Sequence, residues 1–471
     1  MEIDDRNEYD SLKEKTKVLA SKYLIGKKFI EYIDNCNFLK NITEKIISKE
    51  LTREILSIIN KDTIHMLEKI NDFKKYSDIG DLYSLWKIIY IKCCNPILII
   101  GSGLSGLTIA SGIKNQNFLI LEARDRIGGR VFTNENNLDM GAAWIHGSNQ
   151  DNPLNNFINI DSLLPVSSCN PWMHSENTKI KYMNKTHNIT EENRQKLASK
   201  WNSIATKIGN IHNKTIIQGF EEVNEEYKDN DDFHEDDLFS FLYMIEVWCG
   251  GSIKNISTSF LNENNYKNAL FGDYGGSHCL FKNGAKTLIE SIINSFDDKG
   301  QFYEKIRYNQ IVTNIIYNDY YVEVHTNDGK IYNCNKLCIT VPPGPLKDIT
   351  FSPPLKCERI DSLSKIKMGS YKKIQIEFND DDIFWNDIDS PMFLTYNSKI
   401  DGERYYVHND STDFPYILWN NYKYSKNKPI LEAVCPADIG WKLRSLNDEI
   451  IIDIMTAQLR NYYPDMPEPK A

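Results

Sequence analysis

In the first 92 residues, apolar side chains recur at the three- and four-residue spacing of an amphipathic helix. The spacing is clearest in "LTREILSIIN" and "TIHMLEKINDF", and residues 1–92 contain no proline and only two glycines. Both features favour uninterrupted helices over strands and turns. We therefore predict an all-helical N-terminal domain over residues 1–92, with the binding of a protein partner as a candidate role.

From Asn95 onward, short apolar runs alternate with turn residues. The run "PILII", a glycine-rich turn, helix-forming residues and a second run, "NFLILEA", predict a strand–helix–strand unit. Between Asp151 and Asn268 we expect mostly helices, around a segment, Glu221–Asp237, that is too charged for a core. Further strands are predicted in "QIVTNIIY", "YYVEVHT", "KLCITVP", "KKIQIEF" and "PYILWNNY", and a last helix in "NDEIIIDIMTAQLRNYY". The pattern predicts a chain of mixed helices and strands that begins, after residue 92, with a strand–helix–strand unit.

Composition narrows the classes of function. The 471 residues carry 55 Lys and Arg against 65 Asp and Glu, and this net charge of −10 argues against nucleic acid as a partner. The acidic start "MEIDDRNEYD" lacks the pattern of a secretory signal, and no run of about 18 apolar residues predicts a membrane span. The ten cysteines form no CxxC pair, so no metal site is expected. We expect an intracellular protein, cytoplasmic or nuclear, that is neither secreted nor bound to a membrane.

Three glycines, Gly101, Gly103 and Gly106, separate the first apolar run from the helix, and Glu122 ends the second run. This arrangement is typical of a dinucleotide site. The first glycine allows a tight turn, the second lets the backbone approach a diphosphate, and the third lets helix and strand pack closely. The carboxylate can accept hydrogen bonds from the ribose hydroxyls. FAD and NAD are both bound in this way, and a tight turn without a ligand is the plainer alternative.

The next segment, "LEARDRIGGRVFT", adds Gly128 and Gly129 and the cations Arg124 and Arg130, which suit one extended diphosphate. At this point the sequence resembles the flavin-dependent amine oxidases, the family of monoamine oxidases, polyamine oxidases and lysine-specific histone demethylases. The form "WIHGS…NP" is closest to spermine and acetylpolyamine oxidases. The other similar segments are "DMGAAWIHGSNQDNPL", "LFKNGAKTLIESI", "NQIVTNIIY", "CITVPPGPLKDITFSPPL" and "KMGSYKKIQIEF".

The resemblance covers about residues 95–471 and implies a fold, a cofactor and a reaction. It implies a Rossmann-like FAD-binding domain over 93–167 and 270–350, and an α+β substrate-binding domain over 168–269 and 351–471. The implied reaction oxidises a small amine, with a polyamine favoured, by hydride transfer to flavin N5, and oxygen then reoxidises the flavin to give hydrogen peroxide. The implied FAD-binding residues are Gly101, Ser102, Gly103, Gly106, Glu122, Ala123, Arg124, Gly128, Gly129, Arg130, Gly141, Ala142, Ala143, Trp144 and Val312.

Two residues are candidates for the chemistry. By the resemblance, Lys373 matches the lysine that hydrogen-bonds through a water to flavin N5, although its neighbour Lys372 leaves an ambiguity of one residue. Strand alternation alone puts Lys373 on a polar face, where an ordinary solvated lysine is the plainer interpretation. His146 matches a histidine that lines the substrate channel of polyamine oxidases, and a hydrogen-bonded loop histidine is its alternative.

The sequence departs from the family after "PDMPEPKA", where the family pattern continues with a "GE" strand end and a "GAxxSG" helix start over the flavin. From this departure we expect a noncovalent FAD whose ring end is open to water. Two classes of function follow: an active FAD-dependent amine oxidase, or a catalytically silent relative that acts as a binding or scaffold protein.

Overall fold

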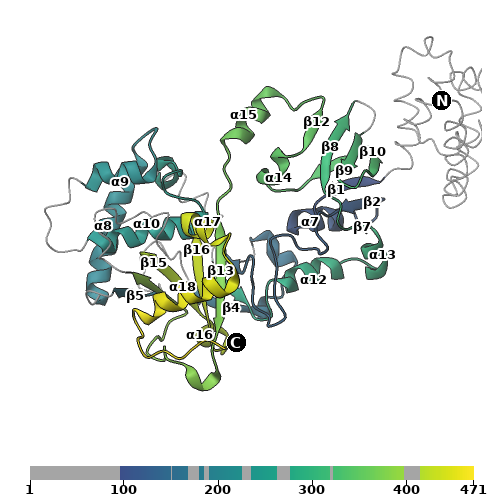
Figure 1. Cartoon of the computed structure of the whole chain (residues 1–471). Coiled ribbons are helices and arrows are strands. Elements are labelled where there is room, and N and C mark those ends of the chain that lie inside the picture. The colour runs from purple at the N-terminus through teal and green to yellow at the C-terminus, as the bar shows by residue number, and fades with distance from the viewer. Residues whose placement is uncertain are drawn as a thin grey trace, which may run out of the picture. The chain divides into compact units, whose positions relative to one another are not determined.

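The computed structural model describes residues 96–149, 151–167, 180–184, 190–224, 235–262, 276–318, 322–396 and 414–470 (Figure 1). The helical domain predicted for residues 1–92 lies outside the described residues, as does most of Glu221–Asp237. The described chain is a mixed α/β structure that divides into two compact units. The first unit contains residues 96–129 and Ile293–Lys365, and the second contains Arg130–Ile292 and Ile366–Ala471.

The first unit contains the predicted strand–helix–strand arrangement, which is confirmed. Strand β1 (Ile97–Ile100) leads into helix α7 (Leu104–Gly112) and then into strand β2 (Phe118–Leu121), which pairs with β1 in parallel. A parallel sheet in the order β11-β1-β2-β7 is completed by β11 (Leu337–Ile339) and β7 (Ile306–Arg307). The remaining elements are β8 (Val312–Tyr317), β9 (Val322–Thr326), β10 (Ile331–Cys334), β12 (Thr350–Ser352), α13 (Lys299–Glu304), α14 (Pro343–Lys347) and α15 (Cys357–Lys365).

The core of the first unit joins its two sheets. Leu98 and Ile100 of β1 and Leu121 of β2 pack with Val312 and Ile315 of β8, in the sheet ordered β10-β9-β8-β12. Nearly every residue of β1 and β2 is buried. Continuous apolar runs of this kind are expected where both faces of a parallel sheet are covered.

The second unit is organised around a five-stranded sheet in the order β13-β16-β15-β14-β5, in which only the β14–β5 pair is parallel. A three-stranded antiparallel sheet, β3-β6-β4, accompanies it. The strands are β3 (Trp144–Ile145), β4 (Leu163–Ser167), β5 (Ile180–Asn184), β6 (His278–Phe281), β13 (Tyr371–Glu377), β14 (Met392–Tyr396), β15 (Tyr416–Asn421) and β16 (Ile430–Pro436). The α-helices are α8 (Glu191–Gly209), α9 (Ile216–Asn224), α10 (Glu235–Cys249), α12 (Lys286–Asn294, which crosses the boundary between the units), α16 (Tyr422–Lys426), α17 (Ala437–Leu443) and α18 (Asp448–Arg460).

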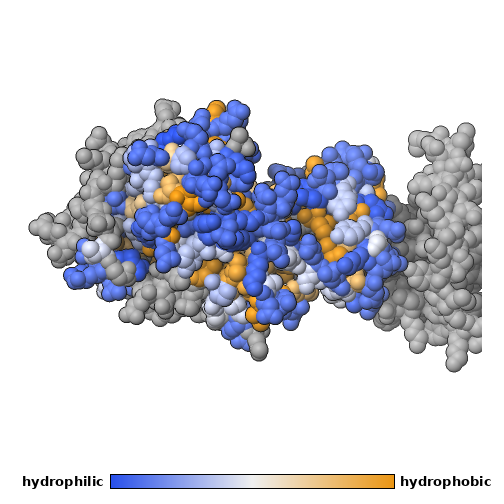
Figure 2. All heavy atoms as spheres, turned by 90° about the horizontal axis from the view of Figure 1, so that it is seen from below, coloured by the Kyte–Doolittle hydropathy of each residue, from blue (hydrophilic) through white to orange (hydrophobic). Residues whose placement is uncertain are grey.

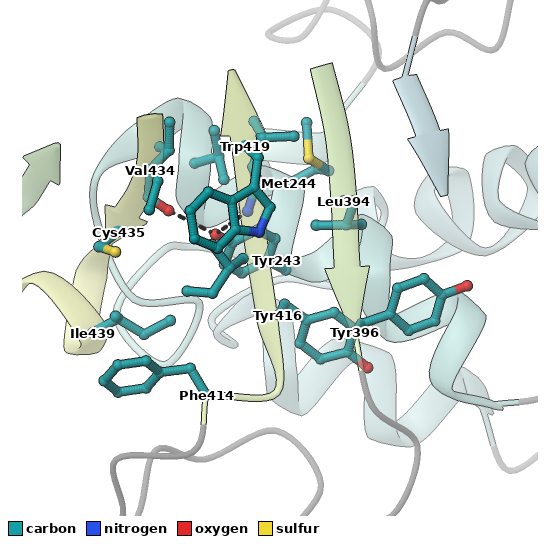
Figure 3. Packing of buried hydrophobic residues seen from close by; sticks show 14 of the residues in the cluster. Tyr243, Met244, Leu394, Tyr396, Phe414, Tyr416, Trp419, Val434, Cys435 and Ile439 are labelled. Carbon is teal, nitrogen blue, oxygen red and sulfur yellow. Dashed lines mark hydrogen bonds between the residues drawn. The ribbon is translucent and has the colours of Figure 1, made fainter. Parts of the chain in front are cut away.

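Every residue of β15 and β16 is buried, so these two strands form the centre of the second unit. Figure 3 shows the aromatic rings that pack at these strands, among which Trp419 and Tyr416 belong to β15 and Tyr243 to α10. The hydroxyl of Tyr243 donates to the carbonyl of Val434 at 2.9 Å and accepts from the amide of Leu418 at 3.1 Å, so α10 is fixed to both strands. A buried phenol needs such a partner because an unpaired polar group in a core is costly.

All five strands and the last helix predicted after Asp297 are confirmed, as β8, β9, β11, β13, β15 and α18. The strands β14 and β16 were not predicted, and neither was β5, which joins a sheet whose other members lie about 200 residues later in the chain. The face seen in Figure 2 is mostly hydrophilic, with hydrophobic side chains confined to patches. Among the helices that the structure describes, none has both the length and the apolar composition needed to cross a membrane.

Candidate active site

The glycine-rich turn between β1 and α7 has a conformation that only glycine allows. Gly101 has a φ of +100°, and a Cβ there would lie 2.9 Å from Oγ1 of Thr340. A Cβ on Gly106 would lie 1.9 Å from the carbonyl oxygen of Gly101, which is far inside contact distance. The close approach of α7 to the end of β1 therefore depends on both glycines.

The second glycine pair packs against the first turn. Gly103 and Gly128 form an isolated parallel bridge, and the amide of Gly128 donates to the carbonyl of Ser102 at 2.9 Å. Gly129 has a φ of +58°, and a Cβ there would lie 3.0 Å from Cα of Gly103. The structure thus brings together the two glycine motifs that the sequence placed 22 residues or more apart.

The two glycine turns cross where Gly103 bridges Gly128. Glu122, which is 6% exposed, lies beneath this crossing of turns. Its Oε2 accepts from the amide of Ser102 at 2.8 Å and from the Ser102 hydroxyl at 2.5 Å, and its Oε1 accepts from the amide of Arg124 at 2.9 Å. The carbonyl of Glu122 accepts from the amide of Gln310, two residues before Val312. Glu122 and the start of β8 are therefore neighbours.

Two arginine side chains lie beside the turns. The guanidinium groups of Arg124 and of Arg126 both donate to the carbonyl of Gly129, at 3.1 and 3.0 Å. Burial lowers the pKa of Arg126, and the charge of Arg124 lowers it further. Arg126 was missed, although it stands inside the quoted motif "RDRIGGR"; Arg130 is exposed and begins the second unit, and Ala123 is exposed.

The predicted residues from Gly141 to Trp144 belong to the second unit, where their visible roles are in packing. A Cβ on Gly141 would lie 2.0 Å from the carbonyl oxygen of Arg130, so the glycine is needed for two backbone segments to touch. Ala142 is exposed, and its amide donates to the same carbonyl. Ala143 is buried against Val166 and Leu280, and Trp144 pairs with Leu280 across β3 and β6.

The side chain of Lys373 is enclosed by protein, which argues against the alternative of a solvated lysine on a polar strand face. Its side chain is 7% exposed; Nζ donates to the carbonyl of Asp139 at 2.9 Å and lies 3.5 Å from Oε1 of Glu432. Protein covers the polar face of β13 at Lys373, whereas Glu377 on the same face is partly exposed. The alternation of a strand marks its two faces but not which positions reach water. Nζ of the neighbouring Lys372 donates instead to the carbonyl of Leu443 at 3.2 Å, so only Lys373 joins this buried polar group.

Asp139 and Glu432 were both missed as site residues. The carboxylate of Asp139 accepts from the hydroxyl of Thr133 at 2.6 Å and from the amide of Ala285 at 2.7 Å, and burial raises its pKa. Glu432 is fully buried in β16. The sequence signal that could have found it is a lone carboxylate inside the apolar run "PILEAVCP", since a charge there must have a buried partner.

His146 follows β3 and packs among aromatic rings. Its Nδ1 lies 3.2 Å from Nδ1 of His278, and its ring centroid lies 5.3 Å from that of Trp248 and 6.4 Å from that of Trp144. Burial, together with His278, lowers the pKa of His146 to about 4, and burial also lowers the pKa of His278. At neutral pH both imidazoles are therefore uncharged.

Comparison with known proteins gives the family. The family described as flavin containing amine oxidoreductase matches residues 104–471. Polyamine oxidase 4 of Oryza sativa subsp. japonica is 27% identical over 399 residues, which are 80% of this chain and 75% of that protein. Lysine-specific histone demethylase 2 of Homo sapiens is 23% identical over 417 residues (83% and 46%), and the corticosteroid-binding protein of Candida albicans is 27% identical over 344 residues (67% and 64%). The chain belongs to the flavin-containing amine oxidoreductase family.

Proposed function

We propose that this chain is an FAD-dependent oxidase of small amines, with a polyamine as the favoured substrate. The observation that carries the proposal is the crossing of the two glycine turns in front of the buried carboxylate of Glu122. Several relatives at about 25% identity are named polyamine oxidases, which supports the substrate class.

The residues around the turns fit noncovalently bound FAD. Helix α7 begins without a side-chain cap and without an acidic residue in its first turn, so its positive end can face a diphosphate. Glu122 accepts three hydrogen bonds, which leaves acceptor capacity for a ribose hydroxyl because a carboxylate has about four lone-pair positions. Arg124 and Arg126 add positive charge beside Gly129.

Lys373 and His146 are the residues that we propose to support the chemistry. When bound, FAD supplies the acceptor for the hydride equivalent from the carbon next to the amine nitrogen. Two of the three N–H groups of Lys373 face Asp139 and Glu432, and we propose that the third holds the water that acts at flavin N5. We assign His146 to the wall that receives the amine, where a neutral imidazole adds no charge to repel an ammonium group.

A second candidate function is supported by one relative. The corticosteroid-binding protein of Candida albicans is named for binding rather than for oxidation, so a member that binds a ligand without amine turnover is the alternative. Both proposals are tested by the same experiment.

The purified full-length chain is examined for flavin absorbance, its heat-released ligand is identified by mass spectrometry, and spermine, N-acetylspermine or a simple monoamine is added without oxygen. We expect FAD, bleaching by at least one amine, and peroxide on readmission of oxygen. Bound FAD without bleaching by any amine supports the binding protein, and NAD as the released ligand overturns the FAD assignment.

A further inference from the structure

We propose that Glu432 is a positioning residue that holds Lys373 in its working orientation. The inference rests on the proposed function, because Lys373 is the residue assigned there to flavin N5. Glu432 itself touches neither the cofactor nor the amine in this assignment. It acts through Lys373.

The sheet places the two side chains on one face of neighbouring strands. In the antiparallel register of β13 and β16, Lys373 is opposite Val434 and Gln375 is opposite Glu432. Lys373 and Glu432 are therefore diagonal neighbours, a separation that long side chains bridge. The resulting distance from Nζ to Oε1 is 3.5 Å, with Lys373 7% and Glu432 0% exposed.

Glu432 is itself held by donors from two strands, β13 and β15, and one helix, α16. Its Oε2 accepts from Nε2 of Gln375 at 2.7 Å and from the hydroxyl of Tyr422 at 3.1 Å, and its Oε1 accepts from Nδ2 of Asn420 at 2.8 Å. Burial and the charge of Glu432 raise the pKa of Tyr422 well above its ordinary value, so the phenol stays a donor. With Lys373 included, each carboxylate oxygen has two partners, and the group has no freedom to turn away.

Among the described residues, Glu432 is the carboxylate that forms the ion pair with Lys373. The Asp139 carboxylate is engaged by Thr133 and Ala285, and its contact with Lys373 is made by the backbone carbonyl. A buried ammonium group without a counter-ion either loses its proton or moves toward water. Loss of Glu432 would thus displace or discharge Lys373.

The first test is a double-mutant cycle of Glu432→Gln and Lys373→Met, measured by thermal unfolding of the full-length chain. Each single variant removes the ion-pair partner of one buried group and should lower the melting temperature by about 5 °C or more, whereas the double variant should lose less than the sum. Glu377→Gln is the control, since Glu377 lies on the same strand as Lys373 but pairs with Lys470 where both side chains are partly exposed; we expect a change of about 2 °C or less. Additive losses in the cycle would overturn the ion pair.

The second test separates positioning from stability. Stopped-flow kinetics follow the half-reaction that Lys373→Met slows, either reduction by the amine that bleaches the parent or reoxidation by oxygen. Glu432→Gln should slow that half-reaction about 10–100-fold, with the amine dissociation constant unchanged, and should not slow it further in the Lys373→Met background. Equal slowing in both backgrounds, or an unchanged rate in the single variant, would overturn the proposal. Tyr422→Phe removes one hydrogen-bond donor to Glu432 and should slow the same half-reaction several-fold. This variant replaces Glu432→Gln as the test if Glu432→Gln does not fold. An unchanged rate in Tyr422→Phe would then count against the proposal. If no amine bleaches the parent, the proposed function fails while the stability cycle still decides the ion pair.

Discussion

Lys372 and Lys373 are adjacent in β13, yet their side chains have different partners. Lys373 meets Asp139 and Glu432 in a buried polar group, and Lys372 reaches the carbonyl of Leu443 at the end of α17. Successive residues of a strand point to opposite faces, so a single step along the chain changes the environment completely. Lys372 is therefore a matched control for Lys373.

We expect Lys373→Met to slow flavin reduction or reoxidation by about 100-fold while FAD stays bound, because the lysine acts at N5 and not on the diphosphate. Lys372→Met should leave both half-reactions within a few-fold of the parent. Stopped-flow absorbance measures both steps. Normal kinetics in Lys373→Met would remove the residue from the mechanism.

His146 gives the stability of the protein a dependence on acid pH. Its pKa in the folded state is about 4 against 6.5 for the free side chain, so the unfolded state binds more protons between these values. The free energy of unfolding should fall by at most about 3 kcal/mol as the pH drops from 6.5 to 4. Urea titrations across this pH range should show that the free energy of unfolding falls less in His146→Phe than in the parent. His212 is exposed, and the control variant His212→Gln should lose as much free energy of unfolding as the parent.

Glu246 acts in the opposite direction. It is 8% exposed at the end of α10, and burial, reinforced by Asp438, raises its pKa to about 8. Its contribution to the free energy of unfolding is fully present below pH 4.5, the pKa of the unfolded group, and is lost as the pH rises through 8. Glu246→Gln should unfold with a melting temperature that falls less between pH 6 and pH 9 than that of the parent. The exposed Glu290→Gln is the control, and equal slopes in all three proteins would contradict the assignment.

At the scale of one element, the β1–α7 turn depends on a contact that admits no side chain. A methyl group on Gly106 would meet the carbonyl oxygen of Gly101 at 1.9 Å, whereas one on Gly112, at the other end of the same helix, would meet nothing within 4 Å. The two glycines therefore form a matched pair for substitution.

Gly106→Ala should lose about 1–3 kcal/mol of stability and most FAD binding, because helix or strand must shift. Gly112→Ala should keep FAD and gain up to about 1 kcal/mol from helix propensity. Chemical unfolding and flavin absorbance measure the two effects. A Gly106→Ala protein with parental stability and FAD content would show that the turn relaxes without consequence.

At the scale of the whole molecule, FAD should stabilise the chain by mass action. A ligand that binds only the folded state adds RT ln(1 + [L]/Kd), about 2.7 kcal/mol at 100 times Kd. We expect the melting temperature to rise steadily with FAD concentration in the parent and in Lys373→Met, and to stay constant in Gly106→Ala. The same titration with NAD is the control, and an equal rise with NAD would contradict the choice of FAD.

Much of the fold was predictable because its signals are local. The apolar runs of β1 and β2, and the glycines between them, give the strand–helix–strand unit without reference to the rest of the chain. Strand β5 was not predictable in this way, because only its pairing with the distant β14 makes it a strand. Strand β16 was missed because a short apolar run also fits a buried helix.

The amino-acid sequence was enough to recognise the glycine turn, Glu122 and the resemblance to flavin-dependent amine oxidases, because backbone conformation and chain spacing are encoded within a few neighbouring residues. The folded chain was needed to see that the Lys373 side chain is enclosed, that Lys372 has different partners, and that Glu432 and Asp139 lie beside the ammonium group of Lys373. These contacts join residues 59 and 234 positions apart, and the environment of a charge is set by what packs around it in space. The apolar run around Glu432 marks a buried charge, but no pattern along the chain identifies Lys373 as its partner.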